Sequence, residues 1–83
     1  MRGTIEISMY PLNESFVEPI KDFIERLNKH EGLDVETNAT STRVSGEYDL
    51  VIATVTEEMR RVHSAGTPRV VFVLKVLCSA TTG

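Results

Sequence analysis

Cysteine is almost absent from the chain, since Cys78 is the only one among 83 residues. A single cysteine excludes an internal disulfide framework and is typical of a reducing compartment. The N-terminal Met1-Arg2-Gly3-Thr4 has no apolar core of the kind that secretory signal peptides carry. No apolar run approaches the length of about 20 residues that a membrane helix needs. We therefore expect a cytoplasmic protein that makes no membrane contact.

Basic and aromatic residues are also few. Nine lysines and arginines oppose twelve aspartates and glutamates, which gives a net charge of −3, and tryptophan is absent. Proteins that bind nucleic acids carry basic stripes, often interleaved with aromatic side chains. We therefore expect no nucleic-acid partner.

Motifs that carry chemistry are missing as well. His30 and His63 are the two histidines, and neither has a second His, Cys or carboxylate at the spacing of a metal site. No Ser-His-Asp order, phosphate-binding loop or zinc signature is present. We expect no metal site and no catalytic residue, and hence a protein that is not an enzyme.

The residues that are present predict a single domain spanning residues 1–83. A domain of this length buries roughly 60–65% of the surface that its unfolded chain exposes, so its core is small. Association of subunits is an expected source of additional stability.

The most informative stretch is Gly3–Leu12, in which apolar and polar residues alternate. Ile5, Ile7 and Met9 share one face, as in a strand with two different faces, and helices should cover that face. The other face is either solvated or covered by another subunit, where it would form the wall of a polar pocket. It carries Thr4, Glu6, Ser8 and Tyr10.

Two segments have the apolar spacing of amphipathic helices. The first begins either with a capping box at Ser15 or with Pro19 in the first helical position, and Gly32 is its natural stop. The second follows Gly46. Its run Leu50–Val55 is strand-like in propensity, but the wider spacing favours a helix. We expect the buried face of this helix to carry Tyr48, Ile52, Val55, Met59 and Val62.

Three further strands complete the pattern, at Leu33–Thr37, Thr42–Ser45 and Arg69–Cys78. The order β-α-β-β-α-β predicts a ferredoxin-like α+β fold, with a four-stranded antiparallel sheet and both helices on one face. We expect the first and last strands at the centre of the sheet. The last strand is apolar on both faces apart from Lys75, so we expect another subunit to cover its outer face.

Three short strings are informative together: Glu6–Leu12, the Thr42–Glu47 stretch, and Gly66 followed by Arg69-Val70 with Lys75. They resemble strings of the YkoF-like family of small thiamine-binding proteins. The chain departs from the family at Ala39-Thr40-Ser41, where the family often carries Pro-Met-Gly, and at Leu77-Cys78-Ser79, where the family usually continues into Asp and Arg. The resemblance implies homodimers or homotetramers joined through their sheets. It also implies thiamine, or its hydroxymethylpyrimidine half, as the ligand.

The residue types on the first strand suit such a ligand. The Glu6 carboxylate and the Ser8 hydroxyl can hydrogen-bond an aminopyrimidine, and the Tyr10 ring can attract a thiazolium cation. The alternative is that these side chains line a wet subunit interface. Both interpretations stay open at this point.

The Gly46 turn offers a second group of candidates. Thr42 and Glu47 flank Gly46 and could contact a ligand, although Glu47 also suits a helix N-terminus. Gly46 itself is expected to supply a backbone conformation that other residues resist. Asn38, Thr40 and Ser41 are secondary candidates. The full predicted ligand-binding set is Glu6, Ser8, Tyr10, Asn38, Thr40, Ser41, Thr42 and Glu47.

Two functions are compatible with these features. One is a non-catalytic binding protein for thiamine or hydroxymethylpyrimidine, without a resident cofactor and assembled as a homo-oligomer. The other is a ferredoxin-like regulatory or assembly module without a thiamine ligand. A cavity lined by Glu6, Ser8 and Tyr10 would favour the first function, and a tightly filled sheet–sheet interface would favour the second.

Overall fold

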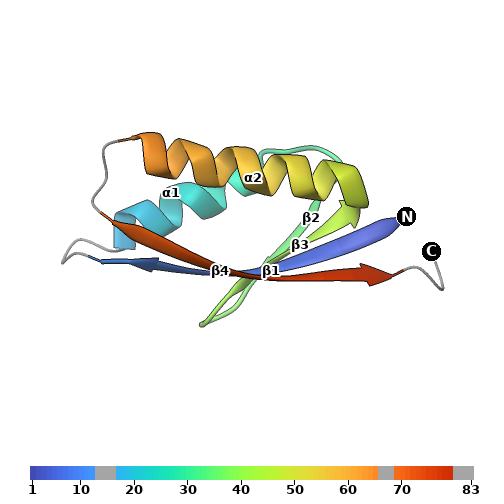
Figure 1. Ribbon diagram of the computed structural model, residues 1–83, viewed down its shortest axis with the longest axis horizontal. Coiled ribbons are helices and arrows are strands. Elements are labelled where there is room, and N and C mark those ends of the chain that lie inside the picture. Colours follow the sequence, from blue (N-terminus) through green and yellow to red (C-terminus); the bar gives the residue numbers. More distant parts are fainter. Residues whose placement is uncertain (13–16, 66–68, 80–83) are drawn as a thin grey trace.

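A computed structural model describes residues 1–12, 17–65 and 69–79 of the chain. Both helices lie on one face of a four-stranded sheet (Figure 1). This confirms the ferredoxin-like α+β fold and the helix at the strand-like run Leu50–Val55. None of the described helices is long and apolar enough to cross a membrane. In chain order the elements are β1 (Arg2–Pro11), α1 (Val17–Asn28), β2 (Asp34–Thr37), β3 (Thr42–Glu47), α2 (Tyr48–Ser64) and β4 (Val70–Ser79).

The strand order in the sheet is β2-β3-β1-β4, and each neighbouring pair is antiparallel. The prediction that the last strand lies at the centre is therefore wrong, whereas the central place of β1 is confirmed. Each βαβ crossover joins two parallel strands with a gap between them for one antiparallel strand. The strand β3 fills the gap between β1 and β2, and β1 fills the gap between β3 and β4. This leaves β4 at an edge.

β4 is not buried on both faces within one chain, because both helices lie on the same face of the sheet (Figure 1). Val71 and Val73 lie on the face away from the helices and are exposed. Phe72 and Leu74 lie on the helix-facing side and pack against the core. A continuous apolar run is thus compatible with an edge strand whose outer face stays uncovered by its own chain.

The core lies between the sheet and the two helices and consists of Ile5, Ile7, Phe23, Leu27, Val44, Val51, Val55 and Val62. The buried face of α2 is rotated from the predicted one. Val51 and Thr54 are buried, whereas Ile52 and Met59 are only partly buried. The apolar spacing along α2 predicted the wrong buried face because a charged residue, Glu58, occupies a core-facing position.

Backbone contacts fix the turns around the helices. α1 begins at Val17, so Pro19 is its third residue, and the alternative start at Ser15 lies outside the described residues. Gly32 has φ +84°, in the left-handed region that favours glycine. Gly46 has no positive φ. It is required for a different reason, because a Cβ there would lie 2.9 Å from the Gly32 carbonyl oxygen.

β3 runs into α2 without a connecting loop. β3 ends at Glu47 and α2 begins at Tyr48. The Glu47 carboxylate accepts hydrogen bonds from the backbone N–H groups of Asp49 and Leu50, each at 3.2 Å. It thereby caps the first turn of α2.

Candidate functional site

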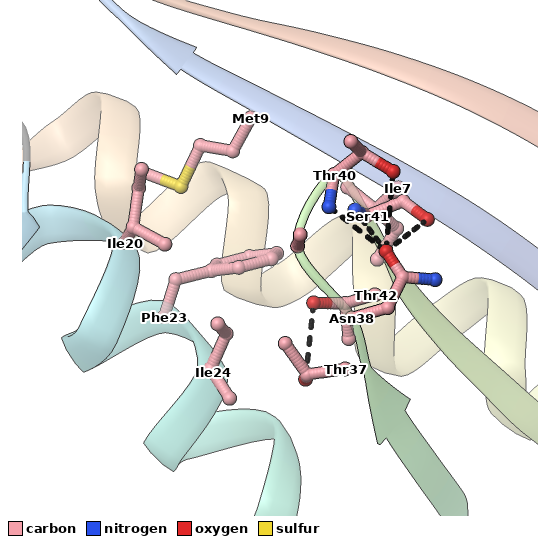
Figure 2. Close-up of a pocket in the computed structure, with 11 residues that line it drawn as sticks. Ile7, Met9, Ile20, Phe23, Ile24, Thr37, Asn38, Thr40, Ser41 and Thr42 are labelled. Atoms are coloured by element: carbon pink, nitrogen blue, oxygen red, sulfur yellow. Dashed lines mark hydrogen bonds between the residues drawn. The ribbon is translucent and has the colours of Figure 1, made fainter.

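A cavity of about 120 Å³ lies between α1 and the turn that joins β2 to β3 (Figure 2). A protein cavity of about 150 Å³ accommodates one benzene molecule, so this cavity has the size of a single six-membered ring. Its apolar side is formed by Ile7, Met9, Ile20, Phe23 and Ile24. The other side is formed by Thr37, Asn38, Ala39, Thr40, Ser41 and Thr42.

Strand alternation along β1 and helical spacing along α1 place the apolar side chains at the cavity. Alternation along β1 directs Ile7 toward the helices, and helical spacing places Ile20, Phe23 and Ile24 on one face of α1. The buried Phe23 ring is held against Phe72, with 5.2 Å between ring centroids. Figure 2 shows this ring extending from α1 toward the β2–β3 turn.

Asn38 organises the turn that forms the polar side. Its Oδ1 accepts hydrogen bonds from the backbone N–H groups of Thr40 and Ser41, each at 2.9 Å. Its own backbone N–H donates to the Ser41 carbonyl at 2.9 Å. Side-chain bonds of this kind stabilise a turn locally. The carboxamide oxygen of Asn38 therefore holds the cavity wall in shape.

Two threonines at the base of the turn provide hydroxyl groups that can hydrogen-bond a ligand in the cavity. The hydroxyls of Thr37 and Thr42 lie 3.2 Å apart, and Thr42 is buried. One hydroxyl donates to the other, so the pair retains one further O–H donor and unshared lone pairs. A planar ligand that carries both a hydrogen-bond donor and an acceptor can pair with the free hydroxyl donor and with a lone pair of the two threonines.

Three predicted residues lie on the opposite side of the sheet from this cavity. The carboxylate oxygens of Glu6 are 3.9 Å from Arg43 Nε and 3.8 Å from Lys75 Nζ. Tyr10 is exposed. Ser8 also belongs to this outer face, and its hydroxyl donates to the Thr40 carbonyl at 3.3 Å, which links the outer face to the turn.

The predicted ligand-binding residues therefore lie in three places: two groups, and Glu47 alone at the N-terminus of α2. The structure brings Asn38, Thr40, Ser41 and Thr42 together at the cavity. It places Glu6, Ser8 and Tyr10 on the outer face, and Glu47 at the α2 N-terminus. The sequence interpretation missed Thr37 and the apolar wall, because helical spacing on α1 is the same for a core residue and for a cavity wall.

A second cavity, of about 270 Å³, lies where α1 and α2 meet. Its lining is Glu18, Pro19, Asp22, Arg26, Arg61, Val62 and Ala65. It has no aromatic side chain, and its acidic and basic groups are equal in number. We therefore regard the first cavity as the candidate ligand site.

Glu58 forms a buried electrostatic cluster between the helices, and it lines neither cavity. Arg26 Nε donates to its Oε1 at 2.8 Å, and His30 Nε2 lies 2.8 Å from its Oε2. Burial raises the pKa of Glu58, but the hydrogen bonds from His30 and Arg26 and the charges of Arg26 and Arg61 outweigh burial and lower this pKa. Among the described residues, no three His, Cys, Asp or Glu side chains are placed to hold a metal ion.

We expect Glu58→Gln to lower the free energy of unfolding at pH 7 by about 2 kcal/mol. A broken buried ion pair costs about 3–5 kcal/mol, and the value is smaller here because Arg26 and His30 are about a third exposed. The pKa of Glu58 is lower in the folded state than the ordinary value of 4.5. The contribution is therefore complete above about pH 4.5 and is lost as the pH falls through the folded-state pKa.

Urea unfolding of the wild type and of Glu58→Gln at pH 7 and pH 3 measures this difference. The difference between the two proteins should become smaller as the pH falls from 7 to 3, because acid favours protonation of the wild-type carboxyl. An equal difference at both pH values would contradict the role given to the Glu58 carboxylate.

Comparisons with known proteins agree with this fold and also identify a protein family that matches the chain. A sequence profile of the thiamine-binding protein family matches residues 5–80. The structure of a proposed thiamine biosynthesis or salvage protein of Thermotoga maritima superposes with a TM-score of 0.83 at 26% identity, covering 96% of this chain and 86% of the other. A hypothetical protein of Methanocaldococcus jannascii gives 0.82 at 30% identity, covering 99% and 84%.

A Streptococcus pneumoniae protein gives a TM-score of 0.85 at 19% identity, covering 98% and 90%, and at that identity it shows the fold alone. No curated protein matches the chain.

Proposed function

Because this chain belongs to the thiamine-binding protein family, we propose that it binds thiamine, or the free hydroxymethylpyrimidine, in the cavity between α1 and the β2–β3 turn. The observation that carries the proposal is the Thr37–Thr42 hydroxyl pair, of which Thr42 is buried, in a cavity of single-ring size that Phe23 also lines. The protein acts by binding and not by catalysis.

The aminopyrimidine ring is the half of thiamine that this cavity suits. Thr42 and Thr37 can accept a hydrogen bond from the amino group and donate one to a ring nitrogen. Phe23 supplies an aromatic contact. Among the described residues, none that lines the cavity has a charged side chain, so we place the cationic thiazolium half at the mouth, in water. Free hydroxymethylpyrimidine and thiamine should therefore bind with similar affinity.

We expect Thr42→Val to weaken hydroxymethylpyrimidine binding about 5-fold, which is the loss of about 1 kcal/mol from one neutral hydrogen bond. Valine keeps the shape of threonine and removes the hydroxyl. Isothermal titration calorimetry of the wild type and the variant measures the change. The matched control is Glu6→Gln on the outer face, whose affinity should equal that of the wild type.

Each other outcome of this titration excludes part of the proposal. A loss of affinity in Glu6→Gln, with none in Thr42→Val, would place the ligand on the outer face instead. If neither hydroxymethylpyrimidine nor thiamine binds the wild type at millimolar concentration, the ligand proposal fails. The assembly module would then be the better interpretation.

We also propose that a second copy of the chain covers the outer face of the sheet, giving a homodimer or a homotetramer. The support is an apolar patch across two paired strands. Tyr10 lies opposite Val71, and Val73 extends the patch along β4, whereas Leu77 lies beyond Lys75 on the same face; all four apolar or aromatic side chains are exposed in the single chain. Patches of this kind on soluble proteins mark contact surfaces. This patch is also what favours the assembly module as the second candidate function.

A further inference from the structure

The cavity of about 270 Å³ where α1 and α2 meet has charged groups of both signs in its lining. The two helices contact each other and run in opposite directions, so the start of α1 lies beside the end of α2 (Figure 1). α1 contributes Glu18, Asp22 and Arg26 to the lining, and α2 contributes Arg61. Two carboxylates and two guanidinium groups therefore border one space.

Glu58 holds the two arginines of this cavity close together. Arg26 Nε lies 2.8 Å, and Arg61 Nε 3.9 Å, from the same carboxylate oxygen, Oε1 of the buried Glu58. Each guanidinium group thus directs its Nε edge toward Glu58. Among the described residues, no hydrogen bond uses the terminal amino groups of either arginine. Those amino groups form a planar fork of donors that matches a carboxylate.

The two carboxylates of the cavity have no cationic partner within the described part of the chain. Asp22 and Arg26 are four residues apart on α1, which is the spacing at which ion pairs form along a helix. Arg26 is paired with Glu58 instead. Glu18 lies one turn before Asp22 on the same side of α1. Both carboxylates can therefore accept hydrogen bonds from an ammonium group.

Apolar side chains complete the lining of this cavity. They are Pro19 of α1, together with Val62, which is buried, and Ala65 at the end of α2. A cavity of about 150 Å³ accommodates one benzene molecule, so this larger cavity has room for a molecule of the size of an amino acid. Its apolar surface can contact an aliphatic side chain.

We propose that the cavity between α1 and α2 binds a zwitterionic α-amino acid with an aliphatic side chain. Arg26 and Arg61 donate to its carboxylate, and Asp22 accepts from its ammonium group. An anion alone would meet the two carboxylates of the cavity, and a cation alone would meet the two guanidinium groups, so a ligand with both charges matches the lining. The site is independent of the proposed pyrimidine cavity, which Ile20 and Ile24 line from another side of α1.

NMR titration of the ¹⁵N-labelled protein with L-leucine tests this proposal. The amide signals of residues 18–26 and 61–65 should shift, and those of the β2–β3 turn should not. Shifts confined to the β2–β3 turn would overturn the proposal, and so would the absence of any shift at millimolar L-leucine. Thr42→Val should bind L-leucine as the wild type does, so this test is separate from that of pyrimidine binding.

Two analogues of leucine test the two charges of the ligand. Isocaproate lacks the ammonium group, and leucinamide lacks the carboxylate. Each should bind the wild type about 10-fold more weakly than L-leucine, which is the lower end of the range for a charged hydrogen bond because the site is partly exposed. If either analogue binds as tightly as L-leucine, the corresponding half of the site is excluded and the proposal fails.

Arg61→Gln tests the carboxylate-binding side of the site. It should weaken L-leucine about 10-fold and leave the affinity for leucinamide unchanged. The matched control is Arg60→Gln, because Arg60 also lies beside Glu57 but does not line the cavity. This control should bind L-leucine as the wild type does. An equal loss of affinity in both variants would show a general effect of charge and overturn the proposal.

Asp22→Asn tests the ammonium-binding side and keeps the shape of the side chain. It should weaken L-leucine about 10-fold and leave the affinity for isocaproate unchanged. The matched control is Glu25→Gln, because Glu25 is exposed on α1 outside the cavity. Unchanged L-leucine binding in Asp22→Asn would contradict the role given to this carboxylate and overturn the proposal.

Discussion

We expect Val73→Asp to halve the mass of the assembly at micromolar protein concentration. Val73 is 49% exposed on the outer face in the single chain, and the proposed subunit contact buries it. An aspartate there would be desolvated without a partner, and a two-fold contact contains the substitution twice. We expect the contact to weaken by about 3 kcal/mol or more, which is at least about 100-fold in dissociation constant.

The matched control is Val17→Asp. Val17 is 52% exposed, but it lies in the first turn of α1, away from the outer face of the sheet. Light scattering should give the wild-type mass for this variant. The outer-face contact is excluded if Val73→Asp also keeps the wild-type mass. It is likewise excluded if the wild type is a monomer.

The second large effect is on stability. We expect Phe23→Ala to lower the free energy of unfolding by about 3–5 kcal/mol, the range for truncation of a buried aromatic side chain. Phe23 is buried and packs against Phe72. Its loss both removes apolar burial and enlarges the cavity beside it.

Urea unfolding monitored by circular dichroism measures this loss. Ile24→Ala is the matched control, because Ile24 lines the same cavity from the same helix but is only partly buried. It should cost about 1–2 kcal/mol. If Phe23→Ala is unfolded at every condition, Phe23→Leu should still fold with a loss of about 1–2 kcal/mol. A loss below 1 kcal/mol for Phe23→Ala would show that the ring is not a core residue.

Local periodicity was sufficient to predict the elements and the two faces of β1, but not the buried face of α2. Alternation along β1 separates Ile7 from Ser8, and helical spacing outweighs the strand propensity of Leu50–Val55. These signals lie within a few residues of each other in the chain. The sequence could therefore predict the element order, the fold class and the two faces of β1.

The features that the sequence did not predict depend on contacts between residues far apart in the chain. Glu58 is buried because Arg26 reaches it from α1 and His30 from the turn after α1, and no pattern within α2 reveals that. The edge position of β4 follows from how two crossovers share one sheet. The cavity exists because α1 approaches the turn at Asn38, so the apolar residues of α1 could not be recognised as its wall. Glu6 and Thr42 looked like one site, although the sheet separates their side chains.

The direct passage from β3 into α2 constrains how the length of this chain can change. β3 ends at Glu47 and α2 begins at Tyr48, so no loop is present to absorb an insertion or a deletion. Each residue added there would turn α2 by about 100° about its axis. It would carry Val51 and Val55 out of the core, and would separate Glu47 from the N–H groups that it caps. We therefore expect no insertion or deletion between β3 and α2 to be tolerated.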